Sequence, residues 1–225
     1  MSGWRYERKF LVTDRSAQEV DCAVQLHPAR FAETFPERHV NSLYLDWPDR
    51  RCFSDAQAGV ADRVKYRARW YGDLFGRIEA PRLELKAKRG LVGSKRCFPL
   101  APFSVGRGAR LDELKRRVAS SELPEDVRSR VGGLELALLT RYRRRYLASA
   151  DGALRLTLDV ELEFVAVHGG KNTFLRAAQD RRNTVVELKY APEADDLGRW
   201  ACSRFPFPVT KSSKYVRGIQ LLEGG

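Results

Sequence analysis

The stretch that decides the fold reads Arg63-Val64-Lys65-Tyr66-Arg67-Ala68-Arg69-Trp70, a strict alternation of charged and uncharged side chains. Successive side chains of a β-strand point to opposite faces, so Lys65, Arg67 and Arg69 share one face. The aromatic Tyr66 and Trp70 lie on the other face. The segment 82–88 (RLELKAK) repeats the alternation. Several strands with aligned cations predict a sheet surface that holds a polyanion.

The composition is that of a globular and strongly basic protein. The chain has 225 residues, of which 43% are hydrophobic, and 41 Lys plus Arg against 29 Asp plus Glu give a net charge of +12. That balance favours nucleic acid, anionic lipid or phosphorylated small molecules as partners. The four cysteines are scattered without a Cys-x-x-Cys pair, which favours a reducing compartment over a disulfide framework or a zinc site. No stretch approaches the ~20 apolar residues of a membrane span, so we expect a cytoplasmic chain.

The hydrophobic pattern predicts about eight strands interrupted by helices, an antiparallel α+β architecture. The strands are expected at 4–12, 40–46, 61–71, 81–88, 94–100, 136–148, 153–165 and 185–191. Helices are expected after an N-cap at Thr13-Asp14 and over 111–118, 124–131, 193–204 and 212–222. The polar segment 169–183 is expected to be a loop.

Rows of like charge need a counter-charge. Two cations about 6 Å apart repel by roughly 3 kcal/mol at an effective dielectric of ~20. About eight antiparallel strands can close into a barrel whose interior holds one ligand. We therefore expect a single domain over residues 1–225, an eight-stranded β tunnel barrel flanked by helices. Its cations line the tunnel, its apolar faces lie outside, and the helix at 212–222 closes the tunnel.

Two other interpretations of the charged faces stay open from the residues alone. Antiparallel sheets commonly have one solvated face, although an unbroken row of cations is unusual there. An RNA-binding sheet places stacking aromatics among its basic residues, whereas Tyr66 and Trp70 are out of phase with Arg67. Nucleic acid is therefore not expected as a partner. The alternation does not decide whether Arg141, Arg143 and Arg145 or Tyr142, Arg144 and Tyr146 face the interior.

Eight motifs follow one another along the chain: 6–9 (YERK), 42–46 (SLYLD), 67–72 (RARWYG), 84–86 (ELK), 142–146 (YRRRY), 154–159 (LRLTLD), 186–189 (VELK) and 211–215 (KSSKY). Over about residues 4 to 222 this ordered set resembles the VTC (vacuolar transporter chaperone) polyphosphate polymerase domain. That domain is a branch of the triphosphate tunnel metalloenzymes, which are related to CYTH domains. The resemblance implies a phosphotransferase that adds the γ-phosphate of ATP to a growing polyphosphate chain, using Mn²⁺ or Mg²⁺. A tunnel hydrolase of inorganic triphosphate or thiamine triphosphate, and a non-catalytic polyphosphate-binding module, are the alternatives.

The resemblance also assigns roles to individual residues. The expected catalytic residues are Arg67, Arg69, Lys86, Arg144 and Arg155. The expected phosphate-binding residues are Lys9, Lys88, Tyr142, Lys189, Lys211, Ser213 and Lys214. The expected metal ligands are Glu187 and Glu7. Asp159 and Glu161 are further candidate carboxylates, and Lys65 and Lys95 are further candidate interior cations.

In two respects the sequence departs from the family pattern. Lys88 stands where eukaryotic relatives are expected to have His. We also expect no SPX regulatory domain before the barrel and no apolar span after it. Control by inositol pyrophosphates, and export coupled to synthesis, are therefore expected to need other chains. The expected ligands are ATP, inorganic phosphate and polyphosphate, and attachment to the inner membrane through a membrane-protein partner is a further option.

Overall fold

The computed structural model describes residues 2–106, 115–118, 120–167, 174 and 176–224. Its main sheet has nine strands: β1 (Ser2–Val12), β2 (Ala32–Asp46), β3 (Arg63–Tyr71), β5 (Arg82–Arg89), β6 (Val92–Pro99), β8 (Glu135–Ala148), β9 (Arg155–Ala166), β10 (Ala177–Asp180) and β11 (Thr184–Tyr190). A separate two-stranded sheet joins β4 (Gly76–Ile78) to β7 (Phe103–Val105). The helices are α1 (Ala17–Gln25), α2 (Arg51–Ala58), α4 (Glu125–Gly132), α5 (Asp195–Ser203) and α6 (Lys214–Glu223), with a 3-10 turn η1 (Pro192–Ala194).

The main sheet closes on itself. Its strand order is β10-β9-β11-β1-β6-β5-β3-β2-β8, and β8 also pairs with β9. Eight strands therefore form a closed antiparallel barrel, while β10 continues along the same edge of β9 that β11 occupies. The expected α+β barrel with flanking helices is confirmed.

Several local expectations need correction. The helix α1 is capped by Ser16 rather than by Thr13 or Asp14, because Ser16 and Glu19 exchange side-chain and backbone hydrogen bonds in a capping box. The segment expected to be a loop at 169–183 contains β10, and α2 was not expected. The strand β2 begins eight residues before the expected start at Val40 because its first half is an exposed ribbon paired with β8. The helix expected at 111–118 lies partly outside the described residues.

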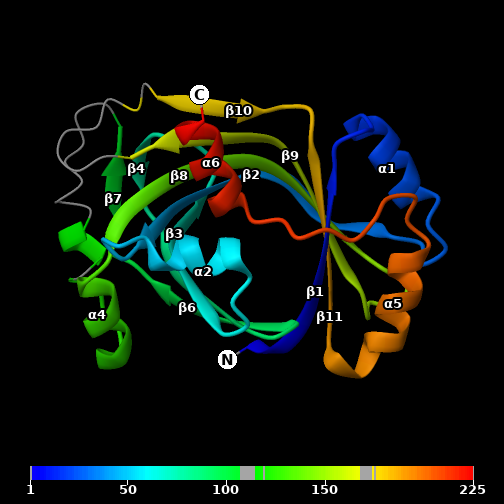
Figure 1. Cartoon of the computed structure of the whole chain (residues 1–225), viewed down its shortest axis with the longest axis horizontal. Coiled ribbons are helices and arrows are strands. Elements are labelled where there is room, and N and C mark those ends of the chain that lie inside the picture. Colours follow the sequence, from blue (N-terminus) through cyan, green and yellow to red (C-terminus); the bar gives the residue numbers. More distant parts are fainter. Residues whose placement is uncertain (1, 107–114, 119, 168–173, 175, 225) are drawn as a thin grey trace.

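Two of the three apolar cores lie on the outer strand faces beneath the helices, whereas the third joins Leu138, Tyr142 and Phe164 of the interior faces to α6. On one side of the barrel α1 and α5 pack over β1, β9 and β11, burying side chains such as Phe10, Val24, Leu156, Leu188 and Ala201. On another side, α4 places Val127 and Val131 in a core with the outward-facing Tyr66, Trp70 and Leu83. Figure 1 shows α4 at one side of the molecule and α1 with α5 at the other. Each fully buried large apolar side chain contributes about 1.5–3 kcal/mol, so these outer cores hold the barrel together.

The helix α6 lies against one end of the barrel, beside α2 (Figure 1). The Tyr215 ring stacks on Tyr44 with centroids 5.0 Å apart, and the Tyr215 hydroxyl donates to Asp46 Oδ2 at 2.6 Å. Asp46 also accepts from the backbone N–H groups of Cys52 and Phe53 at the start of α2. This end, where β2 finishes, is therefore tied to both helices.

The contact between β1 and β6 is incomplete. The two strands pair only from Ser2 to Tyr6 of β1. Farther along β1, Thr210 takes the place of a strand: its N–H donates to the Lys9 carbonyl at 2.7 Å, and its hydroxyl accepts from the Leu11 N–H at 2.7 Å. The tail segment, residues 209–213, thus lines this edge of β1 before α6 begins.

Across the described part of the chain, none of the helices combines the length and the apolar character that a bilayer crossing requires.

Candidate functional site

The first group of interior charges surrounds one buried carboxylate. Glu84 of β5 is 3% exposed and accepts from Arg67 Nε and Nη2 at 2.8 and 2.7 Å. Arg69 Nη1 lies 3.3 Å from the same carboxylate, and Lys95 of β6 donates to it at 2.9 Å. Arg69 also donates to the Tyr142 hydroxyl of β8 at 3.1 Å. We call Glu84, Arg67, Arg69 and Lys95 the Glu84 network.

The second group has several carboxylates. Glu187 of β11 lies 3.2 Å from Lys9 Nζ, 2.8 Å from Lys189 Nζ and 3.5 Å from Arg144 Nη2. Asp159 of β9, fully buried, pairs with Arg144 at 2.5 Å and with Lys214 of α6 at 2.5 Å. Glu7 of β1 accepts from Lys86 at 2.7 Å and lies 3.2 Å from Lys9. These residues form the Glu187 network: Glu7, Asp159, Glu187, Lys9, Lys86, Lys189, Arg144 and Lys214.

Burial and the neighbouring charges compete in setting the pKa values of the interior groups; burial lowers the pKa of Lys86 to about 8, although the charge of Glu7 raises it. Burial alone would raise the pKa of Glu187, but the charges of Lys189 and Lys9 lower it well below the usual value. The same competition lowers the pKa of Glu84, where Arg67 and Arg69 outweigh burial. Glu84 and Glu187 are therefore ionised near pH 7.

Lys65 of β3 lies beside the two networks and belongs to neither. Its ammonium donates to the Ser213 hydroxyl of the tail segment at 2.7 Å. Burial, followed by the positive charges of Lys9 and Lys86, lowers the pKa of Lys65 to about 6. In the empty barrel this side chain is mostly neutral near pH 7.

On β8, the structure places the Tyr142, Arg144 and Tyr146 set on the interior face. Tyr142 and Arg144 are buried within the two networks. Arg143 instead pairs with the exposed Glu161 at 2.9 Å, and Arg145 pairs with acids on the outer surface. The choice that the alternation left open is thus settled in favour of the set that the resemblance selected.

Glu161 was expected to share the face of Asp159, and this was wrong. Glu161 has a φ of 54°, its side chain is 53% exposed, and it pairs with Arg143 outside the barrel. The register of β8 against β9 shifts between Arg141 and Arg143. A bulge of this kind changes the parity of the strand, and a strict alternation does not reveal it.

The remaining expected residues lie at the ends of the barrel. Arg155, the first residue of β9, is exposed and stands opposite Lys189 of β11. Lys88 is half-buried near the end of β5, and its pKa is lowered by burial and by Arg63. Lys211 is exposed in the tail segment. These three lie outside the two networks, Ser213 contacts Lys65, and the other expected residues belong to the networks or contact them.

The interior carboxylates suit a divalent cation that is shared with a ligand. Glu7 and Glu187 flank the same ammonium, that of Lys9, at 3.2 Å each. Within the described residues, no group of three or more His, Cys, Asp or Glu side chains is arranged to hold a metal alone. Mg²⁺ and similar ions are usually held by one or two carboxylates together with substrate phosphates, so Glu187 and Glu7 fit that role.

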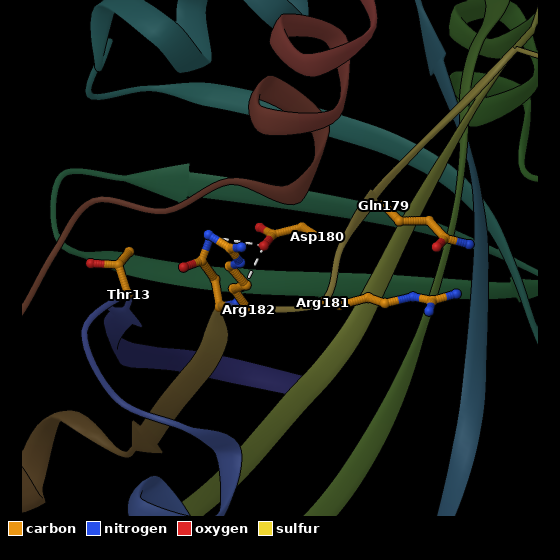
Figure 2. Close-up of a pocket in the computed structure, with 6 residues that line it drawn as sticks. Thr13, Gln179, Asp180, Arg181 and Arg182 are labelled. Carbon is orange, nitrogen blue, oxygen red and sulfur yellow. Dashed lines mark hydrogen bonds between the residues drawn. The ribbon is translucent and has the colours of Figure 1, made fainter.

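A surface cavity of about 430 Å³ lies outside the barrel interior. It is lined by Thr13, Gln179, Asp180, Arg181, Arg182 and Asn183, and Figure 2 shows them around the start of β11. Asp180 accepts from the Asn183 side chain at 2.8 Å and from Arg217 of α6 at 2.5 Å. Its carboxylate therefore fixes the β10–β11 turn to α6, and the cavity contains none of the network residues.

The fold and its interior define the class of this protein. A closed antiparallel barrel directs Arg and Lys side chains from most of its strands into one enclosed space, which is the organisation of a triphosphate tunnel protein.

The chain belongs to the VTC domain family, whose model matches residues 4–223. Solved structures with the same fold include a candidate adenylate cyclase from Bacillus halodurans, with a TM-score of 0.55, 12% identity, and coverage of 96% of this chain and 98% of that one. Another is a candidate adenylyl cyclase from Hippeastrum with a dominant triphosphatase activity, with a TM-score of 0.52, 14% identity, and coverage of 96% and 95%. No curated protein sequence gives a significant match.

The expected family is therefore confirmed. Sequence reasoning overlooked Glu84 as a functional residue, although the alternation places it on the same face as Lys86. This strand parity was the signal that could have placed Glu84 in the interior. It does not reveal that the Glu84 carboxylate pairs with three cations.

Proposed function

We propose that this protein is a polyphosphate polymerase that transfers the γ-phosphate of ATP to the end of a growing polyphosphate chain. The observation that carries the proposal is the convergence of guanidinium and ammonium groups from β1, β3, β5, β6, β8, β11 and α6 on one enclosed interior. An anion of many charges on a narrow chain is the ligand that such an interior matches.

The interior residues would act by positioning and by charge neutralisation, which dominate catalysis of phosphoryl transfer. Arg67, Arg69 and Arg144 offer planar forks to phosphate oxygens and would fix the orientation of the triphosphate. Lys9 and Lys189 would supply point charges where the acceptor phosphate approaches. The like charges of donor and acceptor otherwise repel each other, so these cations lower the barrier to bringing them into line.

A divalent metal held by Glu187 and Glu7 would add Lewis-acid stabilisation of charge on the phosphate oxygens. Holding the carboxylates in place is the task of this chain. Lys9 lies between the two acids, and Lys189 and Arg144 hold Glu187 from the other side. These contacts keep the carboxylates of Glu187 and Glu7 pointing into the interior.

A triphosphatase is the second candidate function, because the Hippeastrum protein with this fold has that dominant activity. The two functions differ in the acceptor, which is a phosphate in one and water in the other. Arg155 and Lys88 at the barrel ends favour the polymerase, since they continue the cationic surface outside the two networks, where a chain longer than one triphosphate would lie.

The test is incubation of the pure protein with ATP and Mn²⁺, followed by separation of the products on a gel. A ladder of polyphosphate that lengthens with time supports the polymerase. Orthophosphate without a ladder assigns the protein to the hydrolases, and binding without turnover makes it a binding module.

Variants locate the activity. Arg67→Ala and Glu187→Ala are expected to reduce the rate about 10²–10³-fold, the cost of removing one group that stabilises charge in the transition state. Arg143→Ala is the matched control, because Arg143 is on β8 next to Arg144 but faces outward. Equal losses in all three variants would contradict an interior site.

A further inference from the structure

The barrel has an end that α6 does not contact. The helix meets the end of β2 at Tyr44 and Asp46. The opposite end of β2 carries Phe35 and Arg38, and because the strands are antiparallel, β3 finishes there at Tyr71 and β8 finishes there after Tyr146. This end has residues of three strands at its rim.

Three aromatic rings and one guanidinium form a cluster on this rim. The Arg38 guanidinium lies over the Tyr71 ring at 4.0 Å and over the Tyr146 ring at 4.9 Å. Phe35 meets Tyr146 edge to face, with centroids 6.0 Å apart. We call Phe35, Arg38, Tyr71 and Tyr146 the mouth cluster.

The mouth cluster continues directly into the phosphate-binding face. Tyr146 lies two residues beyond Arg144 on β8, a rise of about 7 Å, and its ring is 6.0 Å from the Arg144 guanidinium. Tyr71 lies two residues beyond Arg69 on β3. Stacking groups therefore begin where the interior arginines end.

The exposure of the cluster is unusual for a purely structural contact. Phe35 is 61% exposed and Tyr71 is 46% exposed, although both are on strands that pair with their neighbours in the barrel. Aromatic side chains that serve only to stabilise a sheet gain most when they are buried. Exposed ring faces beside a guanidinium are instead the surface on which a nucleobase stacks.

We propose that the mouth cluster binds the base of a nucleoside triphosphate whose phosphates occupy the interior. This deepens the proposed function, on which it rests for the triphosphate in the interior. The base stacks on Tyr71 or Tyr146, and the guanidinium of Arg38 adds a cation–π contact. The protein thereby distinguishes a nucleotide donor from polyphosphate itself, which has no base and is held by the cations alone.

Calorimetric titration with ATP and with tripolyphosphate, both in EDTA, tests this. The measured quantity is the ratio of the two dissociation constants, because loss of a base–aromatic stack weakens the binding of ATP but not that of tripolyphosphate. Whichever of Tyr146→Ala and Tyr71→Ala removes the stacked ring should raise the ratio of the ATP constant to the tripolyphosphate constant about tenfold, which corresponds to one base–aromatic stack. Tyr146→Phe keeps the ring and should leave the ratio within about twofold.

Phe75→Ala is the matched control, since Phe75 is a 45% exposed ring that packs on Phe174. It should leave both constants unchanged. An unchanged ratio in both Tyr→Ala variants would overturn the proposal. Tyr71 is at the last, exposed position of β3, so its variant gives a result even if Tyr146→Ala fails to fold.

Two further outcomes are informative. Competition of a single-stranded oligonucleotide with ATP, lost in Tyr71→Ala, would assign the cluster to nucleic acid and overturn the proposal. Failure of ATP to yield polyphosphate would refute the polymerase but leave the ratio measurable. The two proposals therefore fail separately.

Discussion

The Glu84 network and the Glu187 network use the same types of residue in one interior, but they balance charge differently. In the Glu84 network a single carboxylate serves Arg67, Arg69 and Lys95. In the Glu187 network three carboxylates share five cations, and several cations contact two acids. Arg67 and Arg69 otherwise donate to the uncharged hydroxyls of Tyr44, Ser42 and Tyr142, so Glu84 supplies the counter-charge that a phosphate would replace. We infer that an incoming phosphate competes with Glu84, whereas the acids of the other network keep their places.

The largest effect is expected from Asp159→Asn in the Glu187 network. Asp159 is fully buried between Arg144 and Lys214, so its loss leaves two buried cations without their closest acid. Removing one partner of a buried pair costs about 3–5 kcal/mol. Urea unfolding measures this loss. Glu161→Gln, on the same strand but exposed, should change the unfolding free energy by less than about 1 kcal/mol, and similar losses in both variants would contradict the distinction.

Glu84→Gln should distinguish the two networks by its opposite effects on stability and on tripolyphosphate binding. Loss of charged hydrogen bonds should lower the stability of the empty protein by about 2–3 kcal/mol. The same change frees Arg67 and Arg69, so tripolyphosphate should bind more tightly than it binds the native protein. At ~100 times its dissociation constant a ligand adds about 2.7 kcal/mol, enough to offset the loss. Weaker binding by the variant would show that Glu84 positions the arginines rather than competing for them.

A smaller effect, dependent on pH, is expected from Lys65. The groups that face it are Ser213 of the tail segment and the cations Lys9, Lys86, Arg63 and Arg67. Bound phosphate favours the charged ammonium, so binding takes up a proton above the free-state pKa of about 6. The native protein should bind tripolyphosphate more tightly than Lys65→Met does. The ratio of the two affinities should fall by up to about tenfold per pH unit between about pH 6 and pH 8.

Stability gives an independent check on Lys65. The pKa of Lys65 in the folded protein lies below the ordinary lysine value of 10.5, so the charged side chain destabilises the fold most below about pH 6. That destabilisation is relieved as the pH rises toward 10.5. Lys65→Met should therefore stabilise the empty protein most in acid. A gain that is independent of pH would contradict a depressed pKa.

The smallest effect is expected from Arg143→Gln. Arg143 is 40% exposed and pairs only with exposed acids on the outer surface, a contact worth about 0–1 kcal/mol. Catalysis and tripolyphosphate affinity should not change. A loss comparable to that of Arg144→Gln would mean that both faces of β8 take part in binding.

The sequence was most informative where a strand has one buried face. The alternation of β3 and β5 predicted which residues enter the interior, because a slip of one residue would expose the whole apolar set. Interior positions of Arg67, Arg69 and Lys86 followed from that rule. The rule failed at Glu161, where a bulge inserts an extra residue, and it gave no signal for the exposed first half of β2.

The pairing of charges could not be predicted from the chain alone. The motif at 84–86 places Glu84 and Lys86 next to each other on one face of the strand. In the structure, however, Glu84 pairs with Arg67, whereas Lys86 pairs with Glu7. Those partners come from strands about 20 and 80 positions away, and only closure of the barrel brings them together. The mouth cluster was overlooked for the same reason, since Tyr71 and Tyr146 meet only through Arg38.

The tail segment has a consequence for the integrity of the wall. Thr210 supplies the hydrogen bonds that β6 does not give to the middle of β1. Without these bonds the edge of β1 would present unsatisfied amide groups to a neighbouring chain. The tail segment thus protects the barrel against edge-to-edge association, and Thr210→Pro, which removes the N–H, should increase self-association.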